Sequence, residues 1–195
     1  MSELPSRDEA LAIVHEYTQS ENLRRHMYAV EAAMRAYAGK LGEDSERWGV
    51  TGLLHDFDYE RWPNDAHHAD QEHPSEGVRI LRQRGVPEDV LEAILAHADY
   101  TGVPAETAMA KTLRAVDELA GFIVACALVR PNRLADLKAK SVRKKMKDRS
   151  FAAAVNREEM ATAAEELGVD MSEHIDFVVA SMRPIAAELG LEPRA

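Results

Sequence analysis

Apolar residues recur at helical spacing through most of this 195-residue chain, and this pattern constrains its fold more than any other feature. Over residues 21–40 the residues that would share one helix face are Leu23, Met27, Val30, Ala33, Met34 and Tyr37. Such spacing is typical of an amphipathic helix, whereas a half-buried strand alternates apolar and polar residues. No convincing alternating run is present, and aromatic residues make up only 6% of the sequence. We therefore predict an all-α protein, folded as a helical bundle with short connections.

Capping residues and helix breakers predict where the helices begin and end. Ser6 with Glu9 fits a capping box, and Ser20 fits an N-cap. Pro87 suits the first position of a helix, whereas Pro184 should kink or split the last helix. The expected helices span 7–17, 21–40, 44–55, 75–84, 88–98, 105–129, 156–168 and a last one opened by Ser172, with loops over 57–74 and 99–104 and short helices within 130–150.

The length of the chain suits one domain. We expect a single helical domain over 1–195, with a core over about 20–130 and with the segments 130–150 and 151–190 packed on it. No stretch approaches 18 uninterrupted apolar residues, and the N-terminus lacks the basic start and apolar core of a signal peptide, so we expect a cytoplasmic protein without a membrane span. Cys126 is the only cysteine, and its apolar neighbours suggest a buried, inert thiol. The last helix could support a homodimer through its apolar residues, which are Ile175, Val178, Val179, Met182 and Ile185.

Charge is distributed unevenly along the chain. The formal net charge of −10 argues against binding to a nucleic-acid polymer. The segment 130–150, however, holds nine basic and two acidic residues, which gives it a local charge of +7. It could be a solvated helix face on an acidic protein, or an electropositive rim that draws an anionic substrate toward a metal site. In the second case Arg130 and Lys144 would contact phosphate, the first as a planar fork and the second as a point charge.

The adjacent pair His55-Asp56 follows the apolar run 52–54 and is the first indication of a metal site. Alone the pair is unspecific, because it could also be a helix-ending pair bonded to backbone. Four further candidates lie in or beside expected helices, namely His26, His73, His97 and Asp117. Imidazole nitrogen and carboxylate oxygen together suit iron, manganese, zinc, cobalt or nickel. The spacings are wide and no local metal motif is present, so these residues can meet only through the fold, as interior-facing residues of an antiparallel bundle can.

Each candidate also has a structural alternative. His26 could be a satisfied histidine at a helix edge. Asp117 could form a salt bridge with Arg114 or another cation of the bundle, because a carboxylate in its mainly apolar helix is costly unless it is paired or ligating. His73 and His97 could bind a substrate phosphate beside a single metal.

The polar loop over 57–74 leaves further alternatives open. His67 and His68 could be solvated loop histidines, or either could replace His73 as a ligand. Asp58 and Glu60 could orient ligand histidines as hydrogen-bond acceptors, or could be ordinary loop carboxylates.

The ordered set of histidines and aspartates resembles the HD-domain superfamily of metal-dependent phosphohydrolases. His26, His55-Asp56 and Asp117 are similar to its single-metal set, and His73 and His97 resemble the subset that binds a second metal. The resemblance extends over about residues 20–170, to a bacterial and archaeal branch of small HD proteins, through the segments Gly52–Glu60, His73–Gly77, Ala93–His97, Val116–Gly121, Leu128–Pro131 and Ser141–Lys145. Many relatives read His-Asp-Ile-Gly, whereas Phe57 and Asp58 follow the pair here, which argues against close kinship with signalling phosphodiesterases.

The resemblance implies an HD-type helical bundle that holds one or two divalent ions of iron, manganese, zinc, cobalt or nickel, with magnesium as a further possibility. It implies that His73 and His97 bind the second ion, that Asp56 bridges the two, and that His55 and Asp56 are central to catalysis. The ligands that it implies for the first ion are His26, His55, Asp56 and Asp117. The implied reaction is hydrolysis of a phosphomonoester or phosphoanhydride bond by metal-bound hydroxide, in a small phosphorylated substrate such as a nucleotide. The alternatives are a non-catalytic module that binds a metal and a nucleotide, and an all-helical interaction protein.

Overall fold

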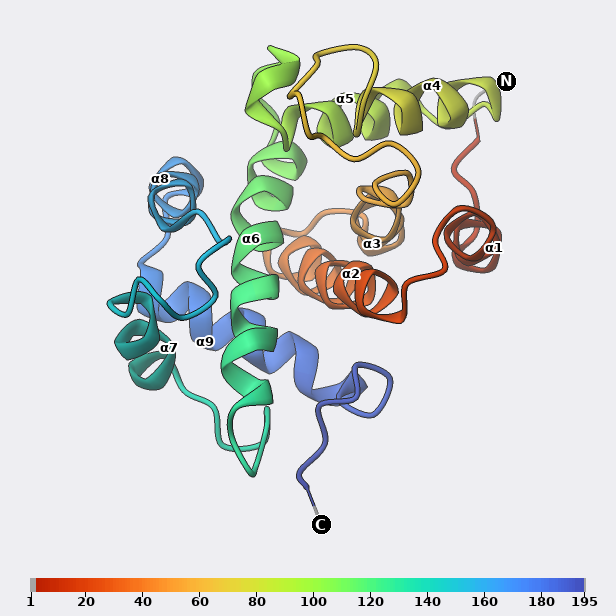
Figure 1. Cartoon of the computed structure of the whole chain (residues 1–195). Coiled ribbons are helices and arrows are strands. Elements are labelled where there is room, and N and C mark those ends of the chain that lie inside the picture. Colours follow the sequence, from red (N-terminus) through yellow and green to blue (C-terminus); the bar gives the residue numbers. More distant parts are fainter. Residues whose placement is uncertain (1–2, 195) are drawn as a thin grey trace. The chain divides into compact units, whose positions relative to one another are not determined.

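The computed structural model describes residues 3–194, and these residues form helices and no strand (Figure 1). The prediction of an all-α protein is therefore confirmed. The elements are α1 (Arg7–Tyr17), α2 (Glu21–Leu41), α3 (Ser45–Leu54), α4 (Ser75–Gln83), α5 (Glu88–Ala96), η1 (Asp99–Thr101), α6 (Ala108–Leu128), α7 (Ala139–Met146), α8 (Arg157–Leu167), α9 (Met171–Met182) and η2 (Arg183–Ile185). The chain divides into two compact units, Met1–Arg114 and Ala115–Ala195. Within the described part of the chain, no helix has the length and hydropathy that crossing a membrane requires.

Local capping chemistry explains the first helix boundaries. Ser6 and Glu9 form the expected capping box, in which Glu9 Oε2 accepts the Ser6 N–H at 2.8 Å. The Ser20 side chain caps α2 by accepting the N–H of Leu23. Gly42 ends α2 in the left-handed region at φ 76°, a conformation that glycine adopts without a Cβ penalty. These two helices match their predicted bounds to within one residue.

Helix α6 begins three residues later than the sequence predicted. The hydroxyl of Thr107 accepts the N–H of Ala110 at 3.1 Å, as an N-cap side chain does. The first helical residue is therefore Ala108 and not residue 105. The basic segment 130–150 contains the single helix α7, preceded and followed by turns.

The last helix also differs from its prediction at both ends. Asp170, and not Ser172, caps α9, because its carboxylate accepts two N–H groups of the first turn at 2.8 and 3.1 Å. Pro184 neither kinks nor splits the helix, since α9 ends at Met182 and the proline lies in the 3-10 turn η2. A proline lacks the N–H that a further helical turn would need.

Helix α3 is the central element of the first unit and packs on α1, α2 and α5 (Figure 1). Its side chains Trp48, Leu53 and Leu54 are buried. Contact with α2 is close at Gly52, where an added Cβ would lie 2.9 Å from Met34 Cγ and 3.1 Å from the carbonyl oxygen of Val30. The close contact fixes the C-terminal end of α3, which the pair His55-Asp56 follows directly.

We predict that Gly52→Ala lowers the free energy of unfolding by up to about 2 kcal/mol, because overpacking costs about 1–3 kcal/mol and the gain in helix propensity returns only about 1 kcal/mol. Gly39→Ala is the matched control, since Gly39 lies in α2 and its Cβ would meet only Ser45 Oγ at 4.0 Å. Urea denaturation should therefore show the Gly39 variant to be at least as stable as the natural protein. Equal stability of the two variants would contradict the close α2–α3 contact.

A buried carboxylate links α1 to α2. Glu31 is only 3% exposed, and its oxygens accept hydrogen bonds from Arg7 at 2.7 and 3.0 Å and from Arg35 at 2.9 Å. Two arginines compensate the burial of this charge, which would otherwise be strongly unfavourable.

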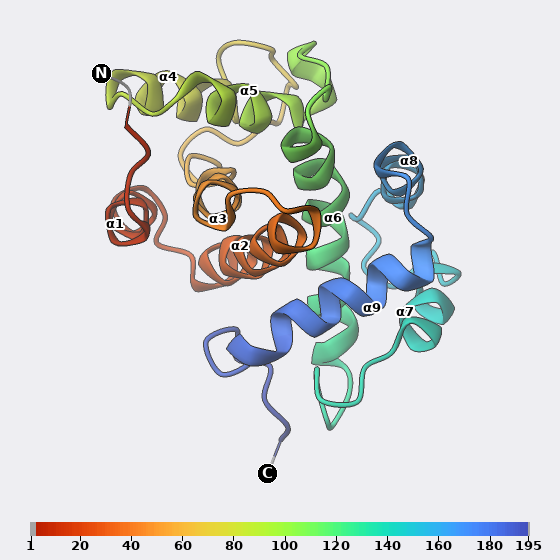
Figure 2. The same ribbon diagram turned by 180° about the vertical axis from the view of Figure 1, so that it is seen from behind.

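In the second unit, α9 packs on α7 and α8 (Figure 2). His174 is buried in α9, and its Nε2 donates to the carbonyl oxygen of Ala115 at 2.9 Å, so this histidine is structural. The apolar face of α9 that suggested a dimer is largely buried within the chain, at Ile175, Val178, Val179 and Met182. Cys126 is buried as predicted, and burial raises the pKa of its thiol to about 11, so it is protonated at neutral pH.

Candidate metal centre

Four histidines of the first unit surround one carboxylate, that of Asp56. His26 comes from α2, His55 follows α3, His73 precedes α4 and His97 follows α5. Ligand atoms of His26, His55 and Asp56 lie within 4.8 Å of one another, and so do those of Asp56, His73 and His97. The structure thus brings together five of the six predicted ligands from separate elements of one unit.

Both carboxylate oxygens of Asp56 face imidazole nitrogens. Its Oδ2 lies 3.5 Å from His26 Nε2, whereas its Oδ1 lies 3.4 Å from His55 Nε2, 3.3 Å from His73 Nε2 and 3.7 Å from His97 Nε2. The Asp56 side chain is 14% exposed and that of His26 is 20% exposed, whereas the His55 side chain is fully buried. Asp56 is therefore shared by the two groups, at the point where the cluster reaches solvent.

The last turns of two helices orient two of the rings. His55 Nδ1 donates to the carbonyl oxygen of Gly52 at 2.8 Å, and His97 Nδ1 donates to the carbonyl oxygen of Ile94. A carbonyl oxygen only accepts, so Nδ1 must carry a proton, and in the neutral ring Nε2 then presents a lone pair. These carbonyls belong to the last turn of a helix and have no intrahelical donor. Each is therefore available to accept the Nδ1–H of the histidine at the C-cap, and this hydrogen bond fixes the ring.

Asp58 orients the third ring. Its Oδ1 accepts from His73 Nδ1 at 2.7 Å, and its Oδ2 accepts the backbone N–H of Gly77 in α4 at 2.7 Å. Burial acts to lower the pKa of His73, but the hydrogen bond to Asp58 and the negative charges of Asp56 and Asp58 outweigh it and raise the pKa above its ordinary value. Of the two interpretations open for Asp58, the orienting acceptor is the one that the structure supports.

The donor set fits a divalent cation. His73 Nε2 and His97 Nε2 lie 3.2 Å apart, although the Nδ1 atom of each ring already donates elsewhere. Two lone pairs at this distance repel each other unless a proton or a metal ion compensates them. The C-terminal ends of α3 and α5, from which His55 and His97 follow, also favour positive charge. Neutral imidazole nitrogens around a carboxylate are ligands that borderline transition metals prefer.

The loop that follows Asp56 is attached to the junction of α1 and α2. Glu60 Oε2 accepts the backbone N–H groups of Gln19 at 2.9 Å and Ser20 at 2.8 Å, and the buried Thr18 hydroxyl donates to the Phe57 carbonyl at 2.8 Å. Glu60 therefore stabilises the start of α2 and does not orient a ligand histidine. Its effect on the site is indirect, because it holds the backbone after Asp56.

The two other loop histidines are engaged away from the cluster. The His67 ring lies against Tyr100 with centroids 4.9 Å apart, and His68 Nδ1 pairs with Asp70 Oδ1 at 2.7 Å. The Tyr100 hydroxyl in turn donates to the His73 carbonyl at 2.6 Å. Of the three loop histidines, His73 is the one that reaches Asp56.

Two residues that support the site, Tyr100 and Gly77, were not among those predicted from the sequence. Gly77 was detectable, because a glycine inside a helical pattern often marks close approach of another group. Here an added Cβ would lie 2.6 Å from Asp58 Cγ. No signal in the sequence distinguished Tyr100 from other loop residues.

The remaining predicted site residues lie in the second unit. Asp117 is in α6, and its role as a ligand stays a prediction. Its alternative partner Arg114 pairs with Asp99 at 2.5 Å. Arg130 and Lys144 line one pocket of about 400 Å³, beside the end of α6 and α7.

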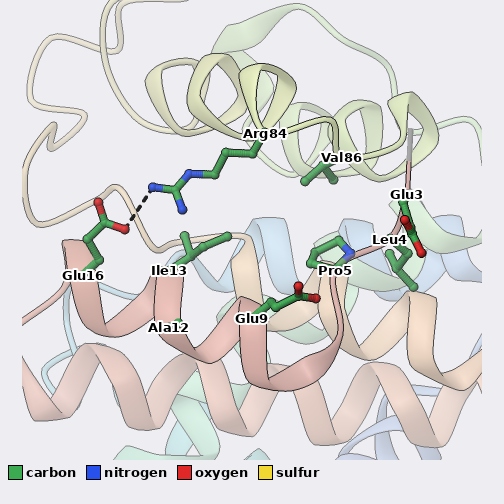
Figure 3. Close-up of a pocket in the computed structure, with 9 residues that line it drawn as sticks. All are labelled: Glu3, Leu4, Pro5, Glu9, Ala12, Ile13, Glu16, Arg84 and Val86. Carbon is green, nitrogen blue, oxygen red and sulfur yellow. Dashed lines mark hydrogen bonds and ion pairs between the residues drawn. The ribbon is translucent and has the colours of Figure 1, made fainter. Parts of the chain in front are cut away.

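Another pocket, which lies in the first unit, is unsuited to binding phosphate. It has a volume of about 620 Å³ and lies between the N-terminal segment, α1 and the loop after α4 (Figure 3). Three glutamates line it, namely Glu3, Glu9 and Glu16, and its Arg84 already pairs with Glu16 at 2.9 Å. The negative lining would repel an anionic substrate.

Residues 23–121 match the family model of the HD domain. Because this match covers half of the chain, the chain belongs to the HD-domain family. HD proteins form a superfamily of metal-dependent phosphohydrolases that bind divalent metals. All six predicted metal ligands lie inside the matched segment.

Several curated relatives are ribonucleases Y. The chain is 30% identical over 102 residues to Ribonuclease Y of Oleidesulfovibrio alaskensis, a match that covers 52% of this chain and 18% of that protein. It is 32% identical over 105 residues to Ribonuclease Y of Lawsonia intracellularis, which covers 54% of this chain and 19% of that protein. The match therefore spans less than a fifth of the length of these relatives. No solved structure matches the chain.

Proposed function

We propose that this protein is a metal-dependent phosphohydrolase that cleaves a phosphomonoester or phosphoanhydride bond in a small molecule, with nucleotides as the first class to test. One observation carries the proposal: the Nε2 atoms of His55, His73 and His97 all face Asp56 Oδ1 at 3.3–3.7 Å. Their Nδ1 atoms are held by other acceptors. Such preorganised ligands with fixed outer hydrogen bonds are typical of catalytic metal sites.

In this proposal, His26, His55 and Asp56 would hold one ion, with Asp117 as the further ligand that the family resemblance implies. His73 and His97 would hold a second ion that shares Asp56. When bound, a divalent metal would supply Lewis acidity toward water and toward a phosphoryl oxygen. The chain's own hydrogen-bond acceptors hold the rings of His55, His73 and His97 in this orientation, and solvent reaches the site on the side where Asp56 and His26 are partly exposed.

A second candidate substrate is the phosphodiester bond of RNA. The names of the curated relatives favour it, since they are ribonucleases. The net charge of −10 opposes it, because a polyanion is repelled by an acidic protein. A short RNA therefore belongs in the same substrate panel as nucleotides and generic phosphate esters.

We expect that metal removal abolishes hydrolysis and that one divalent transition metal restores it. The test is elemental analysis of protein purified without added metal, followed by chelation and by reconstitution with manganese, iron, cobalt, nickel, zinc or magnesium in turn. Phosphate release and RNA cleavage would then be measured for each metal. Stoichiometric metal with nucleotide binding but no product would favour the non-catalytic module. Failure to retain any metal would favour the interaction protein, and both results would contradict the proposed hydrolase.

A further inference from the structure

The pocket of about 400 Å³ in the second unit combines apolar walls with positive charge. Val129 and Leu137 contribute apolar surface, whereas Arg130, Lys144 and Lys145 contribute cationic groups. Small-molecule sites commonly have volumes of about 300–1,000 Å³ and a few polar groups on a mainly apolar lining. The size and chemistry of this pocket therefore suit a small anionic ligand.

Two elements supply the basic groups. On α7, Ser141, Lys144 and Lys145 recur at spacings of three and four residues, which places them on one helix face. Arg130 lies in the turn that follows α6. One cavity thus receives cationic side chains from two segments that come together only through folding.

The cationic groups differ in their existing partners. Arg130 donates from Nε and Nη2 to Asp136 Oδ1 at 3.3 and 2.8 Å, which fixes its guanidinium. The Lys145 ammonium lies 4.5 Å from the centroid of the Phe151 ring. Over residues 3–194, neither Lys144 nor Lys145 forms an ion pair with a carboxylate. The positive charge of the two lysines is therefore not held in a close ion pair within the described chain.

One carboxylate also lines the pocket, and it offsets only part of this charge. Ser150 donates to Asp148 Oδ1 from its hydroxyl at 2.6 Å and from its backbone N–H at 3.1 Å. These hydrogen bonds hold the pKa of Asp148 below its usual range, so the group is ionised at neutral pH. Because Arg130 is also paired with Asp136, the three cations face two carboxylates, and the pocket keeps a net positive charge from its lysines.

A purely structural role explains these residues less completely. Lys144 and Lys145 lie in the last turn of α7, where positive charge stabilises the C-terminal end of a helix. That role needs neither a cavity nor an arginine from another segment. Binding of an anion accounts for both features.

We propose that the pocket formed by Arg130, Ser141, Lys144 and Lys145 binds the phosphate group of a small phosphorylated ligand. The guanidinium and the two ammonium groups would supply charge-assisted hydrogen bonds, and the Ser141 hydroxyl would add a neutral donor. The ligand could be the substrate of the metal centre or a separate phosphorylated molecule. The first source rests on the proposed hydrolase function, whereas phosphate binding itself does not.

Inorganic pyrophosphate is the probe, measured by calorimetry on the full chain after metal removal, at low and at high salt. We expect saturable binding that weakens as salt rises, because the contacts are partly exposed charges. Lys144→Gln should weaken binding at least about tenfold, the effect of losing one charge-assisted contact of about 1.4 kcal/mol or more. Lys140→Gln is the matched control, since Lys140 is an exposed lysine of the same helix that does not line the pocket. The affinity of this variant for pyrophosphate should equal that of the natural protein.

The outcomes separate this proposal from the proposed function. Retention of pyrophosphate binding by Asp56→Asn supports a site independent of the metal ligands. A raised KM with unchanged kcat in Lys144→Gln would identify the ligand as substrate, and an unchanged KM with lost pyrophosphate binding would identify a separate ligand. Absence of binding to the natural protein, or equal binding by the Lys144 and Lys140 variants, would overturn the proposal.

Discussion

Asp56→Asn should remove metal-dependent hydrolysis, lowering kcat/KM by more than about 100-fold, the upper effect usual for mere hydrogen-bond partners of metal ligands. Asp56 is the one side chain that both ligand groups share, and its two oxygens face four imidazoles at 3.3–3.7 Å. Asparagine preserves the shape of the side chain but removes its negative charge. An amide NH2 would also direct protons at nitrogens that should present lone pairs. Metal content measured beside activity should fall with it.

Asp70→Asn is the control for this experiment. Asp70 lies in the same polar loop region, is 78% exposed in its side chain and pairs only locally with His68 among the described contacts. This variant should keep full activity and full metal content. Thermal denaturation of both variants would establish that they fold. Equal activity and equal metal content in the Asp56 and Asp70 variants would remove the basis for the proposed function.

Gly77→Ala should lower metal affinity by about 10–100-fold, because it displaces the acceptor that orients His73. The new Cβ would lie 2.6 Å from Asp58 Cγ and 2.8 and 2.9 Å from its oxygens, so Asp58 must move. The His73 ring would then lose the 2.7 Å hydrogen bond that keeps its Nε2 directed at Asp56. Competition with a chelating dye would measure the affinity.

Two variants make this second prediction specific. Asp58→Asn keeps the volume of the side chain but weakens the hydrogen bond to His73, so it should also reduce metal affinity. Gly39→Ala makes the same chemical change in a helix with open space, and it should leave the affinity unaltered. Loss of stability in Gly77→Ala without any change in metal affinity would show that Asp58 is only structural.

Helix positions were largely predictable because they depend on neighbouring residues. The capping box of Ser6 and the N-cap of Ser20 satisfy N–H groups within the same helix turn. One error arose where two nearby residues could act as caps. Asp170 and Ser172 are both good N-cap residues, and in the structure Asp170 has the extended backbone of an N-cap and accepts the N–H groups of the first turn.

The identities of the site residues were also accessible from the sequence, but their roles were not. His67, His68 and His73 are the same residue type in the same loop, so composition could not distinguish them. Contacts distant in sequence made the distinction: His67 stacks on Tyr100, whereas His73 meets Asp58 and His97. Likewise, Glu60 and Asp58 are equivalent as loop carboxylates until their hydrogen-bond partners are known.

The sequence by itself determined the helical class of this protein, most helix ends and the set of histidines and aspartates from which a metal centre could form. These properties follow from periodicity, capping and side-chain chemistry, which act over a few residues. Only the tertiary structure decided that four imidazoles turn their Nε2 atoms toward Asp56, and that Asp58 and two helix-end carbonyls hold three of those rings. The physical reason is that the rings of His55 and His97 are held by carbonyls three residues earlier, whereas their meeting at Asp56 depends on how the helices pack, as at the close contact of Gly52 with α2. The ring of His73 depends on Asp58, which the N–H of Gly77 in α4 holds in turn.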